Sequence, residues 1–190
     1  MVEFYYGMSG TFKSITLDKR QKETNYSVCR SLIKTWKDME EILGEYRPEY
    51  NDLNYALLHL CTLKNISSTT SDLLVERGVT DAVFYRIKKG FGVGVMNIKE
   101  LVKKELEFCG DSNPKKILLI NKDIDFIRDV ILSEPHRRDA FPGGVEDYLR
   151  EQEDYIKFTS EYNQITDVRT ITNAQEYIES LGLKYMCKNY

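Results

Sequence analysis

A short apolar segment, followed at once by a loop that ends in a lysine and a serine, constrains this chain more than any other feature. Val2–Tyr6 is aromatic and β-branched and is stopped by Gly7, so it predicts a buried first strand. A helix is expected to follow from about Lys13 to Glu23. Gly7, Lys13 and Ser14 stand at Walker A spacing between the two elements. That context predicts a loop whose backbone amides and following helix hold a phosphate group.

The loop residues suit a bound nucleotide and its metal ion. Lys13 supplies a compact positive charge for the β- and γ-phosphates of ATP, and the Ser14 hydroxyl supplies one ligand for Mg²⁺. In one departure from the motif, Phe12 replaces the glycine that usually precedes the lysine, although Gly10 lies two residues earlier. The loop residues expected to bind the nucleotide are Gly7, Ser9, Gly10, Thr11, Phe12, Lys13 and Ser14.

Strand patterns alternate with helical patterns along the rest of the chain. Because parallel neighbours need crossover connections, this alternation predicts the α/β class, a three-layer fold with a mainly parallel five-stranded sheet. No linker or repeat interrupts residues 1–190, so one domain is expected. Further strands are expected at Ser27–Thr35, Asp72–Val75, Lys116–Asn121 and Val168–Ile171, and helices at Trp36–Tyr46, Leu53–Lys64, Thr80–Lys88, Asn97–Gly110, 124–131, 145–156 and Ala174–Leu181.

Two of these helix predictions are specific enough to test. Leu53–Lys64 carries apolar residues on nearly every side and should be largely buried, with Asn51 or Asp52 as its cap. Asn97 and Glu100 form a capping box at the start of a helix that Gly110 closes.

The composition excludes several functional classes. Of the 190 residues, 42% are hydrophobic and 30% are charged, which indicates a folded, water-soluble protein. A net charge of −3 argues against a broad nucleic-acid-binding surface. The four cysteines form no CxxC pair, and with two histidines they offer no evident zinc site. No segment approaches the roughly 20 apolar residues of a membrane span, so a cytoplasmic protein without a membrane partner is expected.

Glu76 and Arg77 follow the apolar run at Asp72–Val75, which should lie beside the first strand. From there the Glu76 carboxylate is expected to reach the magnesium ion or to accept the proton of an attacking hydroxyl. Arg77 is expected to bind a phosphate oxygen. The alternative interpretation is an ion pair at the end of a strand.

Arg137 and Arg138 lie in a polar segment bounded by prolines and glycines, which predicts a mobile lid at about residues 134–146. Their charge would offset the negative charge that shifts during phosphoryl transfer. The alternative is an exposed basic turn. His59 lies on an otherwise apolar helix and is interpreted as a core histidine outside the site.

Together these segments resemble the thymidylate kinase and deoxynucleoside kinase family, through motifs spread from residue 4 to about residue 182. Glu76-Arg-Gly78 with Asp81 is similar to the third-strand signature, a Glu-Arg-Ser or Asp-Arg-Tyr triplet before an acidic residue. Here glycine takes the third place and Asp81 comes about one position early. The resemblance implies that this turn, Asp81 included, contacts the substrate.

The segment His136–Arg138, followed by Glu146–Leu149, resembles the family's lid, and the resemblance implies a lid role for Arg138 first and Arg137 second. In this family a carboxylate at the end of the second strand often serves as general base. Asp38 is the nearest candidate here, so the base is left open between Glu76 and Asp38.

The expected function is magnesium-dependent transfer of the γ-phosphate of ATP to a nucleoside or nucleoside monophosphate, in deoxynucleotide metabolism. Lys13, Glu76, Arg77 and Arg138 are the expected catalytic residues, Arg137 joins the loop in binding ATP, Ser14 and Glu76 hold Mg²⁺, and Asp38 and Asp81 contact the acceptor. One alternative acceptor is a hydroxyl on nucleic acid. Another reading is a nucleotide-binding protein that has lost transfer. The sequence leaves open whether the protein forms a homodimer.

Overall fold

The computed structural model describes residues 1–30, 48–70, 72–88, 90 and 97–183. Within them, five strands form one sheet in the order β2-β3-β1-β4-β5, and every neighbouring pair is parallel. This confirms the predicted α/β class and five-stranded sheet. The strands are β1 (Val2–Tyr6), β2 (Ser27–Cys29), β3 (Leu73–Glu76), β4 (Lys115–Asn121) and β5 (Asp167–Ile171).

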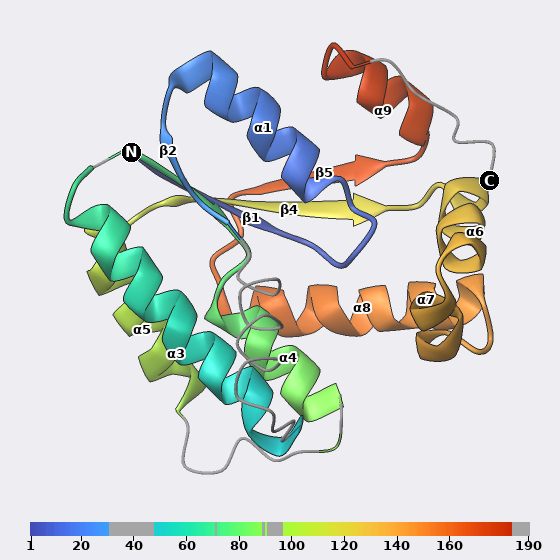
Figure 1. Cartoon of the computed structure of the whole chain (residues 1–190), viewed down its shortest axis with the longest axis horizontal. Coiled ribbons are helices and arrows are strands. Elements are labelled where there is room, and N and C mark those ends of the chain that lie inside the picture. The colour runs from blue at the N-terminus through green and yellow to red at the C-terminus, as the bar shows by residue number, and fades with distance from the viewer. Residues whose placement is uncertain (31–47, 71, 89, 91–96, 184–190) are drawn as a thin grey trace.

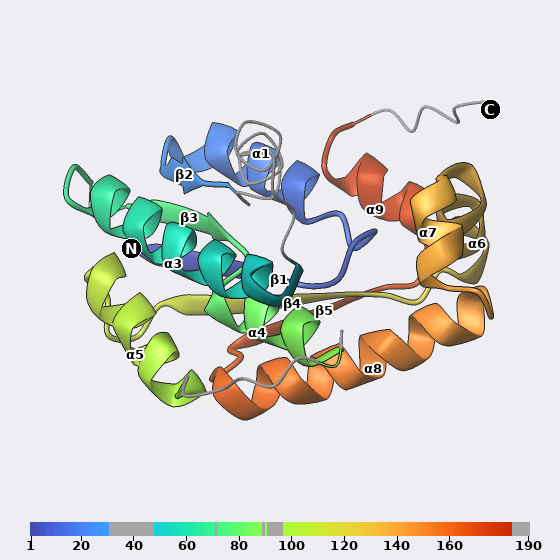
Figure 2. The ribbon, with the colours of Figure 1, turned by 60° about the horizontal axis from the view of Figure 1, so that its bottom comes forward.

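Helices cover both faces of the sheet, which gives the three layers (Figures 1 and 2). Helices α1 and α9 lie on one face, α3, α4, α5 and α8 lie on the other, and α6 and α7 lie beyond the carboxyl end of β4. The described helices are α1 (Lys13–Thr24), α3 (Pro48–Ser67), α4 (Val79–Lys88), α5 (Ile98–Cys109), α6 (Ile124–Ser133), α7 (Pro135–Ala140), α8 (Val145–Tyr162) and α9 (Ala174–Ser180).

The first strand is buried on both faces because its side chains alternate between two cores. Phe4 and Tyr6 belong to the larger core, which includes Tyr155 of α8. Tyr5 packs with Leu17 of α1 in the second core. A chain that enters the sheet at its centre in this way delivers the residues after Tyr6 to the carboxyl edge of the sheet.

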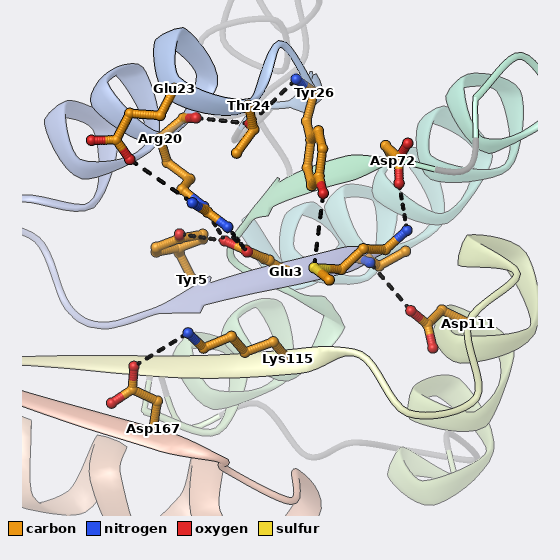
Figure 3. Close-up of polar contacts among 12 residues, drawn as sticks. Glu3, Tyr5, Arg20, Glu23, Thr24, Tyr26, Asp72, Asp111, Lys115 and Asp167 are labelled. Atoms are coloured by element: carbon orange, nitrogen blue, oxygen red, sulfur yellow. Dashed lines mark hydrogen bonds and ion pairs between the residues drawn. The ribbon is translucent and has the colours of Figure 1, made fainter.

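An ion pair joins α1 to the amino-terminal part of β1, away from the residues that follow Tyr6 (Figure 3). The Arg20 guanidinium donates to both carboxylate oxygens of Glu3, at 2.6 Å and 3.0 Å, and the Tyr5 hydroxyl also donates to Glu3. Burial raises the pKa of Glu3, but Arg20 and Tyr5 outweigh burial and hold it below its usual value. These contacts hold the carboxyl-terminal half of α1 against the sheet.

Several predicted elements differ from the structure. The second strand ends at Cys29 within the described residues, while Trp36–Tyr46 lies outside them. Within the described residues, helix α3 runs from Pro48 to Ser67, so Asn51 and Asp52 lie inside the helix and do not cap it. This helix is also less buried than expected, with Leu57 50% exposed and Cys61 exposed.

The predicted start and end of the helix that follows Asn97 are confirmed. Asn97 caps α5 by accepting a hydrogen bond from the Glu100 amide at 3.2 Å, and Gly110 closes the helix in the left-handed conformation. The segment expected to be a mobile lid contains a short helix, α7. None of the described helices is both long and apolar enough to cross a bilayer.

Candidate active site

The Gly7–Ser14 loop leaves the carboxyl end of β1 and runs into α1, at the edge of the sheet that faces α6 and α9 (Figure 1). Gly7 has a φ of 145°, and a Cβ there would lie 2.5 Å from the Thr11 hydroxyl oxygen and 2.7 Å from the Leu119 carbonyl oxygen. Both distances are too short for a real side chain. Only glycine therefore allows the loop to turn this closely over β4.

Phe12 occupies the last position before α1 in a left-handed conformation, with φ 62° and ψ 18°. Glycine adopts this conformation without strain, whereas another residue needs compensation from its surroundings. The Phe12 ring packs at 4.7 Å from the Phe126 ring and 5.7 Å from the Tyr177 ring. The loop thus keeps a turn that favours glycine, and the aromatic contacts of Phe12 stabilise the larger residue there.

The Lys13 side chain is buried within the loop. Its ammonium group donates to the Met8 carbonyl oxygen at 2.5 Å and to the Thr11 hydroxyl at 3.2 Å. Burial, followed by the positive charge of Arg77, lowers the pKa of Lys13 to about 7, against the opposing influence of Asp81 and Glu76. A bound phosphate would favour the charged form of this amine.

Ser14 and Glu76 meet directly. The Ser14 hydroxyl donates to Glu76 Oε1 at 2.6 Å. Glu76 is the last residue of β3 and pairs with Tyr5 of β1, so the sheet register carries its carboxylate to the loop. A hydroxyl beside a carboxylate fits magnesium, which prefers oxygen ligands and takes the remainder from phosphates and water. Among the described residues, no group of three or more His, Cys, Asp or Glu side chains is arranged to hold a metal by itself.

A pocket of about 300 Å³ opens over the loop. It brings together three positively charged residues from separate parts of the chain: Lys13 of α1, Arg77 after β3 and Arg137 of α7. Several cationic groups around one carboxylate form an environment for a polyanionic ligand with a metal ion. The pocket is lined by Ser9, Gly10, Thr11, Phe12, Lys13, Ser14, Ile15, Glu76, Arg77 and Arg137.

The fold has known counterparts among solved structures. The YorR protein from Bacillus subtilis, in complex with phosphorylated GDP, superposes with a TM-score of 0.55 over 90% of this chain and 85% of that chain, at 12% identity. Deoxyadenosine kinase from M. mycoides with bound dCTP gives 0.53 over 96% and 97%, also at 12% identity. Thymidylate kinase from Ehrlichia chaffeensis gives 0.51 over 96% and 98%, again at 12% identity. The chain has the fold of P-loop kinases. The sequence itself matches no protein-family model and no curated protein.

The Gly7–Ser14 loop is called the P-loop below, after the Walker A spacing of its residues. Three of the remaining predicted residues, Arg137, Arg138 and Asp81, lie within the described part of the chain. Arg137 lines the pocket, and a Cβ added at Gly10 would lie 3.6 Å from its Nη1 atom. Arg138 is exposed and does not line this pocket. Asp38 lies outside the described residues. Asp81 is 1% exposed and is occupied by hydrogen bonds within the protein.

The sequence did not predict the side-chain hydrogen bonds that α8 and the end of β4 make to the P-loop backbone. The Tyr155 hydroxyl accepts from the Gly7 amide at 3.1 Å, and the Tyr148 hydroxyl donates to the Ser9 carbonyl at 2.8 Å. The Asn121 side chain donates to the Gly10 carbonyl at 3.0 Å, while Gln152 bonds both backbone groups of Asn121. The available signal was the spacing of polar groups along the buried face of α8, because buried polar groups require partners.

Proposed function

We propose that this protein is an ATP-dependent phosphotransferase that acts on a nucleoside or nucleoside monophosphate in the supply of deoxynucleotides. The observation that carries the proposal is the meeting of Lys13, Ser14 and Glu76 at the P-loop, in a pocket that Arg77 and Arg137 also line. A phosphate-binding turn alone would require no carboxylate next to Ser14.

The P-loop would hold the β- and γ-phosphates of ATP. Backbone amides at the start of α1 would donate to a bound anion, and Lys13 would exchange its hydrogen bond to the Met8 carbonyl for one to a phosphate oxygen. Ser14 and Glu76 would hold magnesium, which neutralises charge on the phosphate oxygens when bound. The close Ser14–Glu76 contact supports the metal-binding role of Glu76 over that of general base.

In the transfer step, the acceptor oxygen forms a bond to the γ-phosphorus, and the bond from that phosphorus to the ADP oxygen breaks. When the acceptor is a nucleoside, the proton of its hydroxyl passes to a base, for which Asp38 remains the candidate. The phosphate oxygen of a nucleoside monophosphate needs no such base. Arg77 and Arg137 would stabilise the negative charge that moves onto the transferring and leaving oxygens. Residues 134–146, which include α7, would act as the lid of a single kinase domain.

The nucleoside class of acceptor is supported by two observations. The Glu76-Arg-Gly78 turn and the arginine segment before α8 resemble motifs of the thymidylate and deoxynucleoside kinase family. The fold is also similar to solved deoxyadenosine and thymidylate kinases. The overall negative charge of the chain argues against an extended nucleic-acid acceptor.

The test is an ATP-consumption assay with nucleosides, nucleoside monophosphates and oligonucleotides as acceptors, on the wild type and on Lys13→Ala. We expect the variant to lose about two or more orders of magnitude in rate, because charge stabilisation and positioning supply nearly all catalysis in phosphoryl transfer. Lys22→Ala is the matched control, since Lys22 is an exposed lysine of the same helix.

Circular dichroism and thermal unfolding establish that both variants are folded. A folded Lys13→Ala protein with a wild-type rate would refute the assignment of the P-loop. Turnover with oligonucleotides alone would move the acceptor to nucleic acid. ATP binding with no turnover on any acceptor would favour a nucleotide-binding protein that has lost transfer.

A further inference from the structure

Asp81 lies in the first turn of α4, directly behind the Glu76-Arg77 turn. Its Oδ2 atom accepts from the Gly78 amide at 3.1 Å, and its Oδ1 atom accepts from the Tyr155 hydroxyl at 3.0 Å and faces Arg77 Nη1 at 3.4 Å. Both carboxylate oxygens are therefore bound by the protein, and the side chain is almost fully buried. These contacts fit a residue that holds Arg77, in place of the substrate contact that the family resemblance implies.

Tyr155 of α8 joins this carboxylate to the P-loop. Its hydroxyl accepts a hydrogen bond from the Gly7 amide at 3.1 Å while it donates to Asp81. Burial and the negative charge of Asp81 raise the pKa of Tyr155, so the oxygen keeps the proton that it donates. A single oxygen atom thus contacts both the first residue of the P-loop and the carboxylate that holds Arg77.

The backbone of Arg77 also requires support. Arg77 has a φ of 71°, a left-handed conformation that a non-glycine residue keeps only where the surroundings fix it. Its amide donates to the Tyr5 carbonyl at 2.9 Å, and its guanidinium extends toward Asp81. This guanidinium lines the pocket, and its contact with Asp81 belongs to a chain of contacts that ends at Gly7.

We propose that Tyr155 and Asp81 are positioning residues that fix Arg77 and the entrance of the P-loop relative to each other. This inference rests on the proposed function, because it assumes that Arg77 acts on the bound phosphates. It assigns no contact with the substrate to either residue. Helix α8 lies on the same face of the sheet as α4 (Figures 1 and 2). From this helix Tyr155 reaches both Asp81 and Gly7.

The test removes one oxygen atom with Tyr155→Phe. We expect kcat to fall by about 10- to 100-fold, because small displacements of a group that acts on the transition state have effects of this size. Tyr162→Phe is the matched control: it removes a hydroxyl from the last residue of the same helix, outside the pocket over the P-loop, and should change kcat less than about twofold. Asp81→Asn is a second variant that keeps the size of the side chain.

A double-mutant cycle separates positioning from a general loss of stability. If Tyr155 acts through Arg77, then Tyr155→Phe should have a clearly smaller effect in an Arg77→Ala background than in the wild type. Equal effects in both backgrounds, or a folded Tyr155→Phe protein with unchanged kcat, would overturn the proposal.

The same cycle, measured by calorimetry as ATP affinity, needs no turnover. It keeps failure of the proposed function distinct from failure of this inference. If the wild type transfers no phosphate but Tyr155→Phe weakens ATP binding less in the Arg77→Ala background, the positioning role stands and the kinase assignment falls. Unchanged ATP affinity in Tyr155→Phe would then remove the positioning role as well.

Discussion

At the scale of single residues, Phe12 shows how a P-loop tolerates a side chain where glycine is usual. The left-handed backbone at this position costs a non-glycine residue about 1 kcal/mol or more. The ring lies between those of Phe126 and Tyr177, and aromatic pairs contribute about 0.5–1.5 kcal/mol each beyond their buried area. Packing of this size is sufficient to offset the backbone strain.

The comparison of Phe12→Gly with Phe12→Ala isolates the backbone strain, because both variants lose the ring. We expect stability to follow the order wild type, glycine variant, alanine variant, with the last two separated by about 1 kcal/mol. At an ordinary helical position alanine is the more stable of the two. Urea unfolding measures the difference, and an alanine variant as stable as the glycine variant would contradict the left-handed turn.

At the scale of elements, α7 decides which arginine faces the pocket over the Gly7–Ser14 loop. Arg137 and Arg138 are adjacent, and successive residues of a helix point about 100° apart. Phe141, which follows α7, packs against Tyr148 at 5.4 Å between ring centroids. Arg137 lines the pocket and donates to Glu134 at 2.7 Å, while Arg138 is exposed.

The two arginines should therefore differ in their effect on transfer. We expect Arg137→Ala to lower kcat by about tenfold or more, since the variant lacks a charge that stabilises the transition state. Arg138→Ala should stay within about twofold of the wild type, as substitutions on the exposed surface usually do. Steady-state rates measure both effects. A larger loss in Arg138→Ala would restore the ranking that the family resemblance implies.

At the scale of the whole molecule, a buried pair of ionisable residues joins three helices next to the Glu76-Arg-Gly78 turn. Glu105 of α5 accepts from His59 of α3 at 2.9 Å and from the amide of Val79 of α4 at 2.9 Å. A Cβ at Gly78 would lie 3.0 Å from the Glu105 oxygens and 2.9 Å from the Tyr6 ring, so the third residue of the Glu76-Arg-Gly78 turn must be small. His59 itself is fully buried, which confirms its interpretation as a core residue.

The charge on His59 makes global stability depend on pH. Burial lowers the pKa of His59, but the nearby Cys29 thiol and the Glu105 carboxylate outweigh burial and raise it from 6.5 to about 10. The contribution of the charged histidine is therefore complete below pH 6.5 and is lost as the pH rises toward 10.

Urea unfolding of the wild type and of His59→Gln across this range tests the prediction. The stability of the wild type, relative to the variant, should fall by up to about 1.4 kcal/mol per pH unit. A difference that does not change between pH 6.5 and pH 10 would mean that His59 is neutral in the folded protein.

Local sequence patterns determined the order of strands and helices and the class of the sheet. The strand, the glycine turn and the helix around Lys13 follow from neighbours within one segment, and their alternation along the chain predicts the parallel sheet. The prediction that β3 lies beside β1 followed from the sheet class and is confirmed. This strand pairing places Glu76 next to Ser14. These features require only periodicity, turn chemistry and the rules of parallel strand connection.

Only the tertiary structure decided what distant segments do to one another. It assigned Asp81 to Arg77 and Tyr155, chose Arg137 over Arg138 for the pocket, and placed the polar face of α8 under the P-loop. Each of these outcomes depends on how a helix is rotated and where it packs. That rotation is set by contacts between residues far apart in the sequence, whereas the spacing of neighbours along the chain encodes only the element to which they belong.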